Sequence, residues 1–429
     1  MRFCEGVLVG MKCMAYIATV TPFEFQACDT GFARGAVAKG DTTPLALAPT
    51  LRLDGWGNEL LRERERTRRM KTDCQMALKY KRRRVRNAAG AFFVDESCVD
   101  CDICRWMDPR TFKRSGLGTV VVSQPRTEED RLATFRAMLA CPTGSIRTMQ
   151  PDKLVVDAMA SYPLPIDEER LPGIYQLAPT TRESMGNVPY LIVRPEGNIM
   201  IDVPRYLHRT AARVRDLGGI KYLIVTSKNN AYGHKRWKKE FPGMIRILHR
   251  FDLITETRVM EERLDGYGPW HLVKKGRESN EAGYATGSTA RFDFNPNPKK
   301  RRAPKDKAVK IVGVPGHTEG AVAVVYTLRR DDGSEDRIAF SGGAVGYISY
   351  LERLGTLPRM PELGNDVHAA SLRRLAKEGI TRLLPGLGAR VSYGSAEEAR
   401  EDLERAAAKA MEKPNFSRHP FLDVKPLRE

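Results

Sequence analysis

Hydrophobic and polar positions predict two different architectures along this chain, the first of them between residues 89 and 150. Short apolar runs at 91–94 and 118–123 predict strands on either side of a loop that is rich in cysteine. A helix is predicted after Thr127, because this capping residue is followed by three acidic residues. Its apolar residues recur at helical spacing: Leu132, Phe135, Met138 and Leu139. The order of these elements predicts a small βαβ-like unit.

The pattern changes after residues 151–172, which are rich in proline and acidic residues and are interpreted as a linker. From 173 to 415 the chain predicts a second domain of mixed strands and helices. Its expected strands are 188–193, 198–201, 222–225, 244–248, 309–314, 321–326 and 338–340. Its expected helices are 205–217, 367–378 and 396–413. The polar, basic stretch 277–307 is interpreted as a surface insertion, and 416–429 as a C-terminal tail.

The net charge of +18 over 429 residues is concentrated in two basic runs, at 61–86 and 299–307. Such runs bind nucleic acid or anionic membranes, or they are solvated linkers and targeting segments. No base-stacking aromatic residues are interleaved with the basic ones, which disfavours a nucleic-acid partner. The sequence therefore favours a solvated role for both runs.

Residues 1–88 resemble an organelle transit peptide followed by a basic linker, because small residues and scattered bases dominate their start. The apolar stretch from Val7 to Val20 is interrupted by Lys12 and is too short to span a bilayer. No later stretch reaches the length of a membrane span, so we expect the mature protein to be soluble.

Cysteine spacing carries the clearest chemical signal in the chain. Cys98, Cys101 and Cys104 are separated by two-residue spacers, and Cys141 follows far downstream, directly before a proline. This arrangement is typical of one ferredoxin-type [4Fe–4S] cluster, in which a tight loop supplies three thiolates and a remote cysteine the fourth. A structural zinc site is the alternative, although zinc ribbons usually supply their ligands as two separated pairs.

The other cysteines have no comparable spacing, and all of them lie in the first 88 residues: Cys4, Cys13, Cys28 and Cys74. Because nothing pairs them, a reducing or thiol-tolerant compartment is the simpler interpretation.

From about residue 92 to residue 390, the chain resembles the plant, algal and cyanobacterial proteins that fuse a single-cluster ferredoxin domain to a metallo-β-lactamase-fold domain. The matching segments are Cys98–Met107, Cys141–Arg147, Arg194–Arg205, Pro315–Gly320 and Leu384–Gly388. The resemblance implies an α/β (α+β) fold class, in which the cluster domain precedes an αββα sandwich. It also implies a chloroplast location, in the stroma.

The same resemblance implies a binuclear metal site in the second domain, but most of its ligands are replaced here. Where the family has histidines or carboxylates, this chain has Ser227, Asn229, Asn230, Gly233, Gly343 and Leu387. Only His234 and His317 remain, with Asp202 as a supporting strand-end residue. A catalytic zinc ordinarily has three protein ligands, so two histidines predict a non-hydrolytic domain without zinc or another divalent metal.

Two functions remain open. The first is a cluster-bearing pseudoenzyme that acts as a redox or scaffold subunit with a protein partner or inside a larger complex, its basic surface docking an acidic redox partner. The second is a metal-dependent hydrolase with an atypical site, which would require a histidine from outside the matched loops. The histidines in question are His208, His249, His271 and His368.

Overall fold

The computed structural model describes residues 82–116, 118–273, 305–356 and 362–412, all of which belong to one compact unit spanning Met70–Glu429. The expected transit peptide, most of the insertion, the tail and the four unpaired cysteines lie outside the described residues. The fold itself begins before residue 89. Asn87 accepts hydrogen bonds from the backbone nitrogens of Val94 and Val121, which ties residues 82–88 to the first strands.

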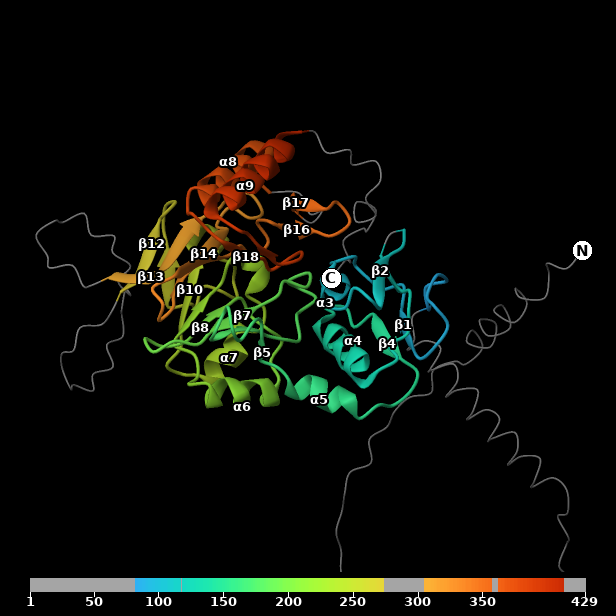
Figure 1. The fold of residues 1–429 in the computed structure, drawn as a ribbon. Helices are drawn as coiled ribbons and strands as arrows, with labels where there is room; N and C mark the ends of the chain where they lie inside the picture. Colours follow the sequence, from blue (N-terminus) through green and yellow to red (C-terminus); the bar gives the residue numbers. More distant parts are fainter. Residues whose placement is uncertain (1–81, 117, 274–304, 357–361, 413–429) are drawn as a thin grey trace, which may run out of the picture. The chain divides into compact units, whose positions relative to one another are not determined.

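The cysteine-bearing part is built from two antiparallel strand pairs and two helices (Figure 1). In chain order they are β1 Phe92–Val94, α3 Ile103–Met107, β2 Phe112–Arg114, β3 Thr119–Val121, α4 Glu128–Ala140 and β4 Ile146–Thr148. The predicted helix is confirmed as α4, with a capping box between Thr127 and Asp130. The expected βαβ-like unit is wrong. The chain reverses through the β2–β3 hairpin, so β4 returns antiparallel to β1.

Residues 151–172, expected to be a linker, are part of the fold. They contain α5 Leu154–Ala160 and β5 Leu164–Pro165. Pro165, one of the prolines that suggested a linker, is tolerated in β5 because β5 is an edge strand, where a missing N–H costs no ladder hydrogen bond.

Two sheets stack face to face in the second part. The first sheet has the order β11-β10-β9-β8-β7-β6-β5, and the second β12-β13-β14-β15-β18-β19. The remaining strands of the first sheet are β6 Ile174–Gln176, β7 Tyr190–Ile192, β8 Ile199–Ile201, β9 Tyr222–Ile224, β10 Ile245–His249 and β11 Glu262–Leu264. Those of the second are β12 Trp270–Val273, β13 Lys305–Gly313, β14 Val322–Arg329, β15 Glu335–Phe340, β18 Arg382–Leu384 and β19 Val391–Ser392. A separate hairpin pairs β16 Gly346–Ile348 with β17 Arg353–Gly355.

Successive side chains along each strand point to opposite faces of its sheet, and this alternation explains how the sheets and helices form layers. Tyr190 and Ile201 belong to the core between the sheets, whereas their neighbours Leu191 and Met200 belong to the core under the helices. Helices α6 His208–Asp216 and α7 His234–Glu240 cover the first sheet, and α8 Asn365–Ala376 and α9 Ala396–Met411 cover the second (Figure 1). Short 3-10 turns, η1 Lys228–Asn230 and η2 Arg250–Asp252, follow β9 and β10. The architecture is the expected αββα sandwich.

Candidate functional site

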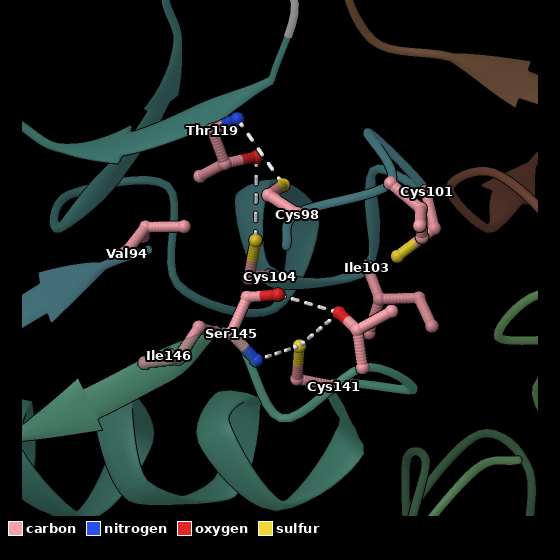
Figure 2. Close-up of a pocket in the computed structure, with 11 residues that line it drawn as sticks. Val94, Cys98, Cys101, Ile103, Cys104, Thr119, Cys141, Ser145 and Ile146 are labelled. Atoms are coloured by element: carbon pink, nitrogen blue, oxygen red, sulfur yellow. Dashed lines mark hydrogen bonds between the residues drawn. The ribbon is translucent and has the colours of Figure 1, made fainter. Parts of the chain in front are cut away.

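The cysteine loop owes its shape to two aspartates in the left-handed backbone region. Asp100 and Asp102 have φ angles of 54° and 71°, a conformation that aspartate tolerates better than most residues. These two turns wrap the chain so that Cys98, Cys101 and Cys104 face one space (Figure 2). Cys141, the residue that caps the C-terminus of α4, faces the same space from the other side.

All four cysteines thus line one pocket. Its other walls are mostly apolar or hydroxyl-bearing: Val94, Val99, Ile103, Thr119, Thr143, Ser145 and Ile146. Figure 2 shows the sulfurs surrounding this space rather than converging on one point. In a cuboidal cluster each thiolate binds its own iron.

Backbone N–H groups point at two of the sulfurs. The Thr119 nitrogen donates to Cys98 Sγ at 3.5 Å, and the Ser145 nitrogen donates to Cys141 Sγ at 3.3 Å. The Thr119 hydroxyl lies 3.6 Å from Cys104 Sγ. Such donors stabilise negative charge on sulfur and are one of the factors that set cluster potentials. Sequence analysis missed these groups, because a backbone donor has no residue signature.

Burial raises the pKa of Cys98, Cys101 and Cys104, and neighbouring thiols add to the effect. Without a cationic group in the pocket, these thiols therefore stay protonated at neutral pH. Binding a metal centre releases the protons and supplies the compensating charge. The donor set, the enclosed pocket and the N–H groups fit an iron–sulfur cluster, which would be held by all four cysteines and would transfer one electron at a time.

In the second part, Asp202 lies at the centre of a buried polar network. It has a φ of 61° and accepts hydrogen bonds from Asn187 at 2.7 Å, from the Thr226 nitrogen at 2.7 Å and from Asn230 at 3.1 Å. Burial raises the pKa of Asp202 to about 7, and these donors oppose that rise. Neutral donors satisfy the carboxylate, so it needs no metal.

His317 is packed against Gly343, one of the positions at which the sequence resemblance implied a replaced ligand. A Cβ built on Gly343 would lie 2.8 Å from Nε2 of His317, so the imidazole occupies the space of any side chain at position 343. Asn229 Nδ2 lies 3.4 Å from the same ring nitrogen. At position 343 the structure therefore has packing of an imidazole ring against the backbone.

His234 does not share this environment. Its Nδ1 accepts a hydrogen bond from Arg246 at 3.0 Å, and its Nε2 lies 3.1 Å from the carbonyl oxygen of Glu256. Burial, followed by the charge of Arg246, lowers the pKa of His234 to about 4. Both ring nitrogens are therefore used in structural hydrogen bonds, and the expected pair of remnant ligands, His234 and His317, is not brought together by any of these contacts.

One of the histidines from outside the matched loops does approach His317. His368, on α8, is 2% exposed and packs against the Pro-Gly-His loop, since a Cβ on Gly316 would lie 2.6 Å from its Nδ1. Among the described residues, both of its ring nitrogens lack a hydrogen-bond partner. Burial, and then His317, lower the pKa of His368 to about 4. No sequence signal predicts this position of His368, because it depends on how α8 packs.

The other histidines have separate roles. His249 and His271 approach backbone carbonyl oxygens at 2.8 and 3.2 Å, and His208 approaches the Tyr206 hydroxyl at 3.1 Å. Over the described ranges, no three His, Cys, Asp or Glu side chains are arranged to hold a single metal ion. No helix in the described part of the chain is long and apolar enough to cross a membrane.

Comparison with known proteins identifies the first part directly. Residues 94–148 match the 4Fe-4S single cluster domain of Ferredoxin I. This match covers all four cysteines that line the pocket. The chain therefore contains an iron–sulfur domain of the [4Fe–4S] class.

The second part is similar to solved metallo-β-lactamases at low identity. The HARLDQ-motif metallo-β-lactamase of Cronobacter sakazakii matches with a TM-score of 0.34 and 15% identity, over 56% of this chain and 92% of its own. The metallo-β-lactamase of Erythrobacter litoralis matches with a TM-score of 0.34 and 15% identity, over 57% of this chain and 91% of its own. The subclass B3 metallo-β-lactamase BJP-1 of Bradyrhizobium japonicum matches with a TM-score of 0.32 and 16% identity, over 55% of this chain and 89% of its own. No curated protein matches the sequence significantly.

Proposed function

We propose that this chain is an iron–sulfur protein that binds one [4Fe–4S] cluster through Cys98, Cys101, Cys104 and Cys141. The observation that carries the proposal is that four buried or half-buried thiols line one pocket with N–H donors aimed at sulfur. The cluster gives the protein a one-electron redox function.

The second part is, in this proposal, a non-hydrolytic relative of the metallo-β-lactamase fold. Two observations support it. His317 fills the space where a ligand at position 343 would stand, and Arg246 occupies the nitrogen that His234 would offer to a metal. A bridging water cannot be activated without at least one well-held metal ion. The αββα part then serves as a redox or scaffold subunit.

A basic surface on this part suits an acidic protein partner. Helices α6 and α7 are joined by an ion pair between Arg215 and Glu240 and by ring contact between Tyr206 and Trp237 at 5.5 Å. The exposed cations of these helices, together with Arg205 just before α6, form what we call the α6–α7 face: Arg205, Arg209, Arg213, Arg215, Lys235, Arg236 and Lys239. Complementary charge of this kind mainly accelerates docking.

Membership of the plant, algal and cyanobacterial fusion family, and location in the chloroplast stroma, belong to the same proposal. They are supported by the sequence resemblance and by the transit-like composition of residues 1–88. Import of the full chain into isolated chloroplasts, with shortening of its N-terminus, is the expected result. A chain that stays outside and uncut would contradict this location.

A metal-dependent hydrolase is the second candidate, and one observation favours it. His368 packs against Gly316, the neighbour of His317 in the chain, and its ring nitrogens have no hydrogen-bond partner among the described residues. Two histidines are one ligand short of an ordinary catalytic zinc site.

Metal and sulfide analysis of the anaerobically purified chain separates the two functions. About four irons and four sulfides per chain, with an electron paramagnetic resonance signal that appears on dithionite reduction, supports the cluster. Cys104→Ser should lose this signal, and Cys74→Ser, from outside the described residues, should keep it. One or two extra metal ions that disappear in His317→Ala and His368→Ala would instead support the hydrolase.

A further inference from the structure

A buried ion network lies between the cluster-binding cysteines. Asp100, Asp102 and Arg105 are 3%, 0% and 6% exposed. Arg105 donates from Nε to Asp102 and from Nη1 to Asp100. Arg114 donates to the second oxygen of Asp100 at 2.9 Å. Two carboxylates and two guanidinium groups therefore compensate one another inside the cysteine loop.

Thr119 connects this network to two cluster ligands. Its hydroxyl oxygen accepts a hydrogen bond from Arg105 Nη1 at 2.8 Å and lies 3.6 Å from Cys104 Sγ. Because Arg105 takes up an acceptor position, the hydroxyl proton is free to point at Cys104 once that sulfur is a thiolate. The backbone nitrogen of Thr119 also donates to Cys98 (Figure 2).

The other end of the network reaches the αββα part. Asp102 accepts a hydrogen bond at 3.1 Å from the backbone nitrogen of Ser349, the residue after β16. Arg114 lies over the ring of Tyr350, 3.9 Å from its centroid. The same hairpin exchanges backbone hydrogen bonds between Tyr347 and Ala389, next to the loop that follows β18. The β16–β17 hairpin thus contacts both the cysteine loop and a former metal-site loop.

We propose that Thr119, Arg105 and Asp102 form a relay through which the β16–β17 hairpin sets the reduction potential of the cluster. This inference rests on the proposed function of the cysteine pocket. Reduction adds one electron to the cluster and transfers no proton in this step. Hydrogen bonds to sulfur and nearby positive charge favour the reduced form. The Ser349 N–H offsets the charge of Asp102, which leaves more of the Arg105 charge to act on Cys104.

The relay makes the αββα part a regulator of the cluster. A ligand or partner that moved the hairpin away from Asp102 would lower the potential, because the uncompensated carboxylate opposes the added electron. The converse also holds: reduction of the cluster strengthens the pull on Arg105 and so favours the docked hairpin. Thr119, Arg105 and Asp102 are positioning residues in this scheme.

The test is a redox titration of the holoprotein, with dithionite as electron donor and electron paramagnetic resonance as readout. Ser349→Pro removes the N–H that reaches Asp102, whereas Ser349→Ala keeps it. We expect Ser349→Pro to reduce the ratio of reduced to oxidised cluster at fixed potential by up to tenfold, which is about 59 mV for one electron. Ser349→Ala should match the wild type.

A second pair of variants tests the sulfur end of the relay. Thr119→Val loses the hydroxyl and should lower the potential in the same direction, whereas Thr119→Ser should not. If Ser349→Pro fails to bind the cluster, Tyr350→Leu against Tyr350→Phe replaces it, because only the former removes the ring under Arg114. The relay would be overturned if the two variants at Ser349, or the two variants at Thr119, had the same cluster reduction potential at equal iron content. A wild-type chain without iron would instead refute the proposed function.

Discussion

Arg246 donates a hydrogen bond from Nη1 to Nδ1 of His234, at 3.0 Å. The guanidinium is itself held by Glu261 at 2.9 Å and by the carbonyl oxygen of Val259. A nitrogen that accepts from an anchored cation has no lone pair left for a metal ion. His234 is therefore held as a structural residue by Arg246.

Replacing His234 should change stability and leave metal content unchanged. In His234→Ala, Arg246 loses an acceptor in a buried position, which costs about 1–3 kcal/mol of unfolding free energy. Urea unfolding and metal analysis of the same preparation measure both quantities. His208→Ala, at an exposed position, is the control and should be close to neutral. A fall in bound metal without a fall in stability would show that His234 is a ligand after all.

Burial of His368 predicts a pH dependence of stability. Its pKa is lowered from 6.5 to about 4, so the unfolded chain binds this proton first as the pH falls. The contribution of neutral His368 is complete above pH 6.5 and is lost progressively between pH 6.5 and 4.

His368→Leu removes the titrating group while keeping an apolar side chain against the loop. From pH 7 to pH 5, we expect the wild type to lose roughly 1–2 kcal/mol more unfolding free energy than the variant. Urea unfolding of both proteins at the two pH values, with equal iron content, gives the difference. Parallel losses in the two proteins would mean that His368 is not held neutral by burial.

Docking through the α6–α7 face predicts a salt-dependent electron-transfer rate. Arg209→Glu with Arg236→Glu should slow reduction of the cluster by an acidic electron-carrier protein about tenfold at low salt. The difference should disappear near 1 M salt, where the Debye length is about 3 Å. Arg373→Glu with Lys377→Glu, at the opposite helical layer, changes the net charge equally and is the matched control. Equal slowing by both double variants would show that net charge, and not this face, controls the rate.

Much of the fold was predictable where local pattern and tertiary packing agree. The capping residue Thr127 and the hairpin formed by β7 and β8 follow from rules that act within a few residues. Residues 151–172 were misinterpreted because proline is unfavourable in a strand in general but not at a sheet edge. Their true place depends on a neighbour, β6, with which β5 pairs.

The candidate site also contains residues that could be predicted from the sequence and contacts that could not. Cys98, Cys101 and Cys104 were predictable because two-residue spacing constrains how thiols converge. The donors from Thr119 and Ser145, and the contact between Asp102 and Ser349, were not. All three donors are backbone groups, which nearly every residue has, and the contact between Asp102 and Ser349 joins residues that are far apart in the sequence.

A double-mutant cycle on Gly343 and His317 tests the proposal that the His317 ring has filled the space of a metal ligand at position 343. The Cβ of Gly343→Ala would meet the His317 ring at 2.8 to 3.0 Å, so the ring must move, at a cost of about 1–3 kcal/mol. In His317→Ala the space is free, and the same substitution should cost less than about 0.5 kcal/mol. Urea unfolding of the four proteins gives the coupling energy directly.

Coupling of this size would mean that restoring a single acidic ligand at position 343 cannot rebuild the site, because the remaining histidine has moved into the ligand's place. Loss of metal chemistry would then be a property of the packed loops as well as of the missing side chains. An equal cost of Gly343→Ala in both backgrounds would instead show that the ring yields freely. The site would then be open to an atypical metal, and the hydrolase hypothesis would gain support over the pseudoenzyme.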